Sequence, residues 1–484
     1  MTPLPPRPRA APALRPRAAS ALRLGPLAVL AALSGCASLA PDGGFAPVQA
    51  LLRPQLAQEA HWARDDAERA ALDQRAAELL AQPLDADAAV QLALLRHRGL
   101  QAALHELGIA DAERVQASRL PNPGLSLARL RRGDELEWET GLHLGLGGLV
   151  TLPWRRAAAQ RRLERVQAEA AQAVLVHAAQ VRRAWVRAVA AQQSLGYARQ
   201  VADAAGAGAE LARRLKAAGN FNALQQLREQ AFEADAALGL VAAQRQQVAT
   251  RERLLRLLGL ADEAAALRLP DRLPELPAAL PDQPEPDTGA LARRLDVQAA
   301  RLAVAQAAQE AGVDAAAVFT DALELGAQRN RSNQAPTQRG WELGLELPLF
   351  DLGDARRARA QARLRQAVER AAQVAIDARS ELREAQAGQR AAWALARRQR
   401  DELLPLRERI AEENLLRYNG MLIGVFELLA DARGQIAGVN AAIEAQRDFW
   451  LADADLQMAL VGATALEAAP AASLGPAAPA AAAH

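Results

Sequence analysis

The chain has 484 residues, of which 51% are hydrophobic and only 3% are aromatic, and its formal net charge is +2. The apolar residues are mostly Ala and Leu, with Arg, Glu and Gln between them, a mixture that favours long helices with narrow packing seams. Basic and acidic side chains are interleaved, which argues against a one-sided basic surface for nucleic acid. The single cysteine, Cys36, excludes an internal disulfide and a metal site made of several cysteines.

The first 35 residues show the order of features that is typical of a secretory signal peptide. Arginines precede an apolar stretch at 24–33, which is too short to span a membrane as a helix. The sequence Leu33-Ser34-Gly35-Cys36 then resembles a bacterial lipobox, which implies cleavage before Cys36 and acylation of that residue. Ala37 follows Cys36, whereas an aspartate at that position usually retains lipoproteins in the inner membrane. The resemblance therefore points to the outer membrane. The alternative interpretation is a Pro/Arg-rich tail with a chance cysteine.

Apolar residues recur at near-helical spacing from Leu84 to Ser118, which predicts one continuous helix. The segment Pro121-Asn122-Pro123-Gly124 ends this helix, because proline lacks a backbone donor and restricts the residue before it. Leu125, Leu127 and Leu130 then indicate a short strand. It leads through a charged turn into the next strand.

The clearest alternation in the chain runs from Leu136 to Gly147. Leu136, Trp138 and their even-numbered neighbours are mostly apolar, while the odd-numbered residues are charged, histidine or glycine. This period of two predicts a strand with one greasy face and one polar face. A soluble sheet sandwich would also alternate, so the pattern alone leaves both a soluble and a membrane-embedded sheet open.

A long helix is predicted after each pair of strands, from Pro153 to about Ala204 and from Gly353 to about Leu416. Each reverses at a glycine-containing turn, marked by Gly219 in the first case and Gly420 in the second. A second helix then runs back to about residue 260 or 460. Each unit is therefore expected to be a strand pair with a helical hairpin below it.

The duplication of this unit is visible in the sequence itself. Leu100-Gln101-Ala102-Ala103 recurs as Val297-Gln298-Ala299-Ala300, and the strand from Trp138 to Leu144 recurs from Trp341 to Leu347. The offset stays near two hundred residues throughout, which is typical of two copies of one unit. The sequence therefore predicts a mainly α fold with a small β part, built from two helix–strand–strand–helix repeats.

These patterns divide the chain into six segments. They are a signal peptide at 1–35, a lipidated N-terminal segment at 36–83, a first repeat at 84–260, a proline-rich connector at 261–287, a second repeat at 288–462 and a disordered tail at 463–484. Outside the signal peptide, no segment has the roughly 18 apolar residues of a spanning helix. If the chain crosses a membrane, it does so with its strands.

Four strands cannot close a sheet on their own. An unpaired strand edge in hydrocarbon leaves polar backbone groups without partners, and familiar transmembrane barrels have about eight strands or more. If the strands span a bilayer, several chains must therefore combine them. Oligomerisation follows from the strand count.

The chain resembles the TolC-type outer membrane factors from about residue 83 to residue 462. The resemblance rests on the lipobox, the duplicated unit, the junction Leu345-Glu346-Leu347-Pro348-Leu349-Phe350-Asp351 and the sequence Phe426-Glu427-Leu428-Leu429 after the second turn. It implies a homotrimer with a shared β-barrel of four strands per chain and a long periplasmic tunnel of helices. The first repeat departs from the pattern, with Gly145-Leu146-Gly147-Gly148 at its strand-to-helix bend.

The resemblance also implies partners and a place in the cell. Such a chain would sit in the outer membrane, anchored by lipid, extend into the periplasm, and dock with a periplasmic adaptor and an inner membrane pump. It would act as the passive exit duct of an efflux or secretion system. The cargo, whether metal ions, drugs or polypeptides, is selected by the pump and is not encoded in a readable motif here.

Two acidic residues are candidates for the tunnel entrance. In the family, acidic side chains just after the second hairpin turn ring the narrow entrance, and Glu427 aligns with one of them. A second acidic position falls on Ala430, with Asp431 beside it. Glu427 and Asp431 are four residues apart and share a helix face, so three copies would make a ring that favours cations. Without the resemblance, an exposed acidic pair is more typical of a solvated helix face.

The sequence contains no nucleophile motif, phosphate loop or metal-ligand spacing, so we expect no catalysis, no cofactor and no metal site. The main alternative to a duct is a periplasmic coiled-coil lipoprotein. It would act as a scaffold or adaptor without a pore, and its alternating segments would form a small soluble sandwich.

Overall fold

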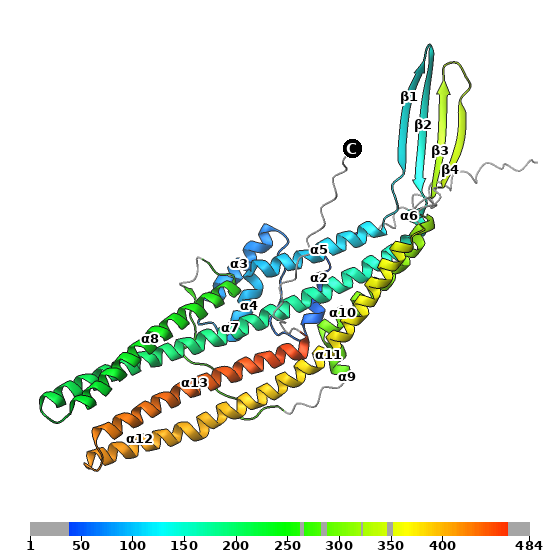
Figure 1. The fold of residues 1–484 in the computed structure, drawn as a ribbon. Helices are drawn as coiled ribbons and strands as arrows, with labels where there is room; N and C mark the ends of the chain where they lie inside the picture. The colour runs from blue at the N-terminus through cyan, green and yellow to red at the C-terminus, as the bar shows by residue number, and fades with distance from the viewer. Residues whose placement is uncertain (1–37, 262–265, 282–287, 321–322, 346–351, 463–484) are drawn as a thin grey trace, which may run out of the picture.

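A computed structural model describes residues 38–261, 266–281, 288–320, 323–345 and 352–462 of the chain. The molecule is elongated, with a β-sheet at one end and the turns of two helical hairpins at the other (Figure 1). The predicted signal peptide, Cys36, the predicted disordered tail and the junction at 346–351 lie outside the described residues.

The fold is mainly helical with one small sheet, as the sequence predicts. No helix in the described part of the chain has an apolar stretch long enough to cross a membrane. The helices of the N-terminal segment and first repeat are α2 (Phe45–Leu52), α3 (Asp66–Leu80), α4 (Ala86–Arg96), α5 (Arg98–Ser118), α6 (Gly147–Val150), α7 (Leu152–Ala217) and α8 (Ala223–Leu258). Those of the second repeat are α9 (Thr288–Arg293), α10 (Leu295–Thr320), α11 (Asp354–Arg398), the π-helix η2 (Gln399–Leu403), α12 (Leu404–Asn419) and α13 (Val425–Val461).

Both repeats contribute a hairpin to a single antiparallel sheet. Its strands are β1 (Gly124–Arg132), β2 (Glu135–Gly145), β3 (Leu323–Ser332) and β4 (Gln338–Leu345), in the order β1-β2-β3-β4. The first hairpin closes tightly because Arg132 pairs with Glu135, and Gly133 takes the positive φ of 61° that the two-residue turn requires. The repeats are joined by pairing of β2 with β3, in which Leu142 lies opposite Ala327.

The helix predicted from Leu84 to Ser118 is wrong in one respect, because the structure divides it into α4 and α5. His97 adopts an extended conformation between them, and its ring nitrogen Nδ1 accepts a hydrogen bond of 3.1 Å from the backbone of Leu100. The end of α8 packs against this break. A Cβ on Gly259 would lie only 3.0 Å from the carbonyl oxygen of Arg96. The break thus provides room for the returning helix of the hairpin.

The two long helices that leave the sheet differ from one another. In the first repeat, α7 continues beyond the predicted end near Ala204 to Ala217 without interruption. In the second repeat, the helix predicted from Gly353 to Leu416 is divided into α11 and α12, with the wider turns of η2 between them. Pro405 lies in the first turn of α12. Proline cannot donate to the regular hydrogen-bond ladder and its ring crowds the preceding turn, and the π-helix accommodates both effects.

The principal hydrophobic core lies around α7. Helices α2 to α5 and the end of α8 bury their apolar faces against it, and the indole nitrogen of Trp185 donates a 2.8 Å hydrogen bond to the carbonyl of Leu84 inside this core. The described part of the proline-rich connector is packed as well. The indole nitrogens of Trp393 and Trp450 donate to the carbonyls of Pro277 and Pro274, each at 3.1 Å. The connector therefore ties the second hairpin to the middle of the molecule.

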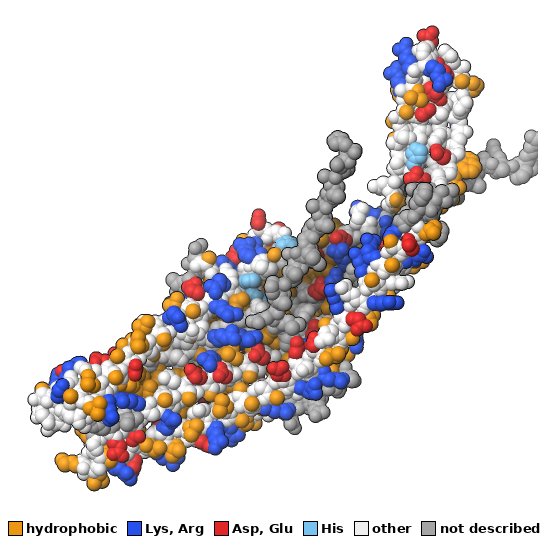
Figure 2. Space-filling view, in the orientation of Figure 1, with side chains coloured by type: hydrophobic (Ala, Val, Ile, Leu, Met, Phe, Trp, Pro, Cys, Tyr) orange, Lys and Arg blue, Asp and Glu red, His pale blue; other side chains and the backbone are white. Residues whose placement is uncertain are grey.

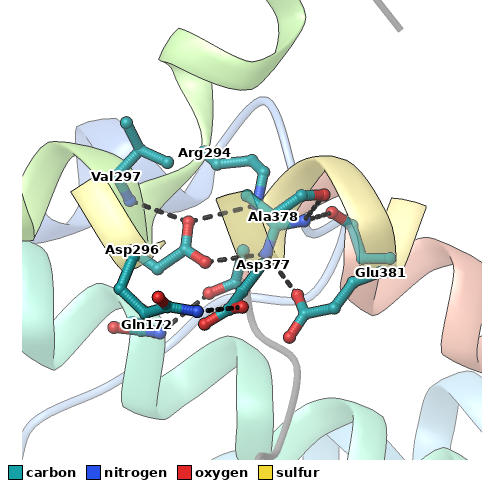
Figure 3. Close-up of polar contacts among 10 residues, drawn as sticks. Gln172, Arg294, Asp296, Val297, Asp377, Ala378 and Glu381 are labelled. Carbon is teal, nitrogen blue, oxygen red and sulfur yellow. Dashed lines mark hydrogen bonds and ion pairs between the residues drawn. The ribbon is translucent and has the colours of Figure 1, made fainter. Parts of the chain in front are cut away.

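A buried arginine joins the start of α10 to α11 and α13 (Figure 3). The side chain of Arg294 is 1% exposed and forms ion pairs with Asp296 at 2.7 Å and with Glu381 at 2.8 Å. It also donates to the backbone carbonyls of Ala378 and Ala459, at 3.1 and 2.7 Å. A buried guanidinium is tolerated when its donors are satisfied in this way. The sequence analysis did not identify this cluster.

Candidate functional site

The register of the sheet places its apolar side chains together on one face. Leu142 lies opposite Leu125 on β1 and opposite Ala327 on β3, which in turn lies opposite Trp341 on β4. Because side chains two residues apart share a face, the leucines next to this row join it. The apolar side chains of this face are Leu125, Leu127, Leu136, Trp138, Leu142, Leu144, Leu323, Leu325, Ala327, Trp341, Leu343 and Leu345.

The other face of the sheet is polar and holds all the acidic residues of the four strands. They are Glu135, Glu137, Glu139, Glu324 and Glu342. His143 lies among them, with its Nε2 atom 3.1 Å from the hydroxyl of Ser126. Its ring lies over Gly326, where a Cβ would approach Nδ1 to 3.1 Å. The small residues on this face allow the polar side chains to lie across neighbouring strands.

The apolar face of the sheet is exposed, unlike that of a soluble sheet. Trp341 is 78% exposed, Leu127 68% and Leu125 66%, while Gly141 and Gly326 on the polar face are buried. Among the described residues, no helix or second sheet covers the apolar face, and the sheet projects beyond the helices in Figure 2. A soluble sheet buries its apolar face against a core, and an exposed apolar surface of this kind marks a contact with a membrane or another protein.

The hairpin turns lie at the opposite end of the molecule from the sheet. Gly219, with φ of 83°, follows α7, and Asn222 caps α8 by accepting a hydrogen bond from Gln225. In the second turn Gly420 follows α12 with φ of −79°, and Met421 takes the left-handed conformation with φ of 58°. Both glycines lie at the turns, but only the first uses the conformational freedom of glycine.

Glu427 and Asp431 lie in the first turns of α13, just beyond the second hairpin turn. Glu427 is exposed and Asp431 is half-buried. Neither carboxylate forms an ion pair with a described residue. Their spacing places them on the same side of the helix, and the positive end of the helix dipole favours the charge of Glu427 in the first turn. Their orientation toward a tunnel axis remains a prediction, because a single chain has no such axis.

An ion pair connects the two hairpins two residues beyond Glu427 and Asp431, and the sequence analysis did not identify it. Arg433 on α13 forms a 2.8 Å ion pair with Glu229 on α8, and its guanidinium lies over the ring of Phe232 at 4.5 Å. Glu229 is only 2% exposed. The signal available in the sequence was Glu229 itself, an acidic residue within the helix that follows the first turn. No group of three or more His, Cys, Asp or Glu residues within the described part of the chain has a metal-binding arrangement.

No protein-family model matches the sequence, and no curated protein matches it. The fold, in contrast, matches several solved structures. A membrane protein from Pseudomonas aeruginosa has a TM-score of 0.66 at 21% identity, and the match covers 78% of this chain and 93% of that one. The CmeC outer membrane channel of Campylobacter jejuni has a TM-score of 0.63 at 13% identity, over 84% and 89% of the two chains. The open state of the MtrE outer membrane channel of Neisseria gonorrhoeae has a TM-score of 0.62 at 20% identity, over 78% and 88%.

The chain has the TolC-type fold. The matches cover nearly the full length of the solved channels, so both repeats take part. The TolC-type fold thus agrees with the family that the sequence resembles. At these identities the comparison establishes the arrangement of helices and strands, and individual side chains must be argued from their own surroundings.

Proposed function

We propose that this chain is a subunit of an outer membrane exit channel, which passes substrates from the periplasm to the exterior. The observation that supports this most directly is the sheet, whose exposed apolar side chains lie on one face while all its acidic side chains lie on the other. Strands of 8 to 11 residues are suited to crossing a bilayer when tilted. In such a position the apolar face contacts lipid and the polar face lines water.

The subunits assemble as a homotrimer, in which four strands from each chain close one barrel. The open edges of β1 and β4 require partner strands, since each pairs on one side only within the described sheet. The helices support assembly as well. Exposed apolar residues on α8 recur with heptad spacing, at Leu227, Leu238, Val241 and Val248. Such a stripe is buried when the hairpin of a neighbouring subunit packs against it.

The duct is passive and has no catalytic role, and its transport energy comes from an inner membrane pump coupled through a periplasmic adaptor. Acylation of Cys36 anchors the chain to the outer membrane. The hairpin tips, which lie farthest from the sheet, form the periplasmic entrance (Figure 1). Glu427, with Asp431 beside it, supplies a ring of negative charge there, and such a ring attracts cations and hinders anions.

Conductance in planar bilayers tests this proposal. The purified trimer should form channels that select cations, and Glu427→Ala should reduce that selectivity because it removes one charge from each subunit. Glu369→Ala is the matched control, since Glu369 is an exposed acid on α11 far from the turns. A wild-type protein that forms no channels contradicts the function. Unchanged conductance and selectivity in Glu427→Ala contradicts only the role of Glu427.

The rival function, a coiled-coil scaffold without a pore, predicts a different response to loss of the lipid. A Cys36→Ala variant of a scaffold becomes soluble in buffer, whereas a subunit with an embedded sheet still requires detergent. The uncovered apolar face favours the second outcome. Sedimentation of the variant after membrane extraction with and without detergent distinguishes them.

A further inference from the structure

The charged residues of the sheet are sorted by sign between its two faces. Every acidic residue of the four strands lies on the polar face. Five of the six arginines lie on the apolar face, toward the hairpin ends of the strands: Arg129, Arg131, Arg329, Arg331 and Arg339. The sixth, Arg132, lies on the polar face. We call the five residues the arginine collar.

The collar is a continuous band across neighbouring strands. Arg329 lies opposite Arg339, and Arg331 lies opposite Trp138, which in turn lies opposite Arg129. The guanidinium of Arg129 is 5.5 Å from the centre of the Trp138 ring. All five side chains are exposed. No acidic residue shares their face within the four strands.

The position of the collar along the strands places it at the outer surface of the lipid bilayer. Leu323 and Leu345 mark the end of the apolar face near the helices, and Arg329 follows Leu323 by six residues, about 20 Å along the strand. The collar therefore lies where the apolar band ends, on the side away from the periplasmic helices. Tryptophans within and beside the band are typical of a membrane–water boundary. Arginine side chains there extend toward the headgroups while their stems remain in hydrocarbon.

We propose that the arginine collar binds the phosphate groups of outer-leaflet lipids, specifically the phosphate monoesters of a phosphorylated glycolipid headgroup. This inference depends on the proposed function, because it requires the apolar face to contact lipid. Guanidinium groups keep their charge at all physiological pH values and bind phosphate through two parallel hydrogen bonds. No carboxylate shares the collar's face within the strands, so its guanidinium groups can bind an anion from outside the protein. The Nε of Arg131 is the exception, because it donates a 3.1 Å hydrogen bond to the carbonyl of Gly133. Phosphate is the anion that the lipid surface supplies at this depth.

Binding of purified lipid A to the full chain in detergent tests the inference. Native mass spectrometry should show diphosphoryl lipid A bound to the wild type, with at least roughly tenfold weaker binding of lipid A from which both phosphates have been removed. The variant Arg329→Gln, Arg331→Gln and Arg339→Gln should lose this preference by a similar factor. Arg132→Gln is the matched control, because it removes an arginine of the same sheet from the other face, and it should bind like the wild type.

Two outcomes would overturn the inference. Equal binding of the two lipids by the wild type means that phosphate is not recognised, and undiminished preference in the triple variant means that the collar is not the site. Bilayer conductance of the same variants separates this result from the proposed function. A triple variant that conducts normally but has lost the lipid preference supports both proposals. A wild type that inserts in no bilayer contradicts the function, and the inference falls with it.

Discussion

The two helical hairpins come from repeated sequence, yet they are held in the molecule by different means. The first, α7 with α8, packs against the N-terminal helices α2 to α5 and shares the main core with them. Within the described part of the second, α11 to α13, two small clusters of residues are buried, and none of the residues of α12 is buried. Polar contacts replace apolar burial there, through Arg294 and through the connector. Duplication of a sequence thus fixes the path of the chain but not the forces that stabilise it.

The two hairpins also differ in the continuity of their long helices. Helix α7 runs for 66 residues without a break, whereas its counterpart is divided by a π-helix. A regular helix packed against a large core resists bending. The second hairpin, less buried and locally irregular, has fewer contacts to lose when it moves. Substitutions that remove its few anchors should therefore separate the behaviour of the two hairpins.

The largest effect is expected at Arg294. Arg294→Met removes the buried guanidinium and leaves Asp296, Glu381 and two backbone carbonyls without their shared donor. We expect a loss of about 3 kcal/mol in stability, because breaking a buried ion pair removes the cation that offsets the burial of the two carboxylates. Thermal unfolding in detergent should show the loss, and hydrogen exchange should locate it in α11 and α13 rather than α7. Arg293→Met, at the exposed neighbouring position, serves as the control and should unfold like the wild type.

The main core of the first hairpin should respond to pH through His177. Burial lowers the pKa of His177 to about 4, and the stacked ring of His97, 4.0 Å away, adds to the effect. The unfolded chain therefore binds a proton at pH 5 that the folded chain does not. The contribution of neutral His177 to the free energy of unfolding is fully present above about pH 6.5. It decreases as the pH falls toward 4, and at pH 5 the loss is about 2 kcal/mol.

Comparison of melting temperatures at pH 7 and pH 5 checks this. His177→Gln keeps a donor that can reach the carbonyl of Leu257, which lies 3.1 Å from Nε2 in the wild type, but does not titrate. The drop between the two pH values should be smaller in the variant. Because the other histidines are retained, a drop of equal size in both proteins would show that His177 is not responsible.

A smaller effect is expected where the two hairpins meet near their tips. Arg433→Gln leaves the buried Glu229 without its cation, and we expect a cost of about 1 kcal/mol because Arg433 itself is about one-third exposed. Amide exchange should increase at the ends of α8 and α13. Arg417→Gln breaks only an exposed pair within α12 and should leave exchange in α8 unchanged. Equal exchange in both variants would mean that the link does not hold the tips together.

Local patterns predicted the order of helices and strands in each repeat. Alternation in β2 predicted a two-faced strand, and the glycine turns marked the ends of the hairpins. Breaks within helices were missed, since His97 is extended for a tertiary reason, namely the approach of α8. Pro405 was a local signal for the interruption after α11, but the sequence analysis did not use it. The collar and the Arg433 link require the register between repeats, which no local pattern contains.

Boundaries between subunits would fall at β1 and β4, the first and last strands of the sheet. In a closed ring, β4 of one copy completes the hydrogen bonds of β1 of the next, so removing any copy exposes two rows of amide groups to hydrocarbon. Partly built rings are consequently too costly to persist in a bilayer. If the proposed channel forms in this way, insertion and assembly are a single cooperative event, and a cell should contain finished pores or unassembled chains with few intermediates.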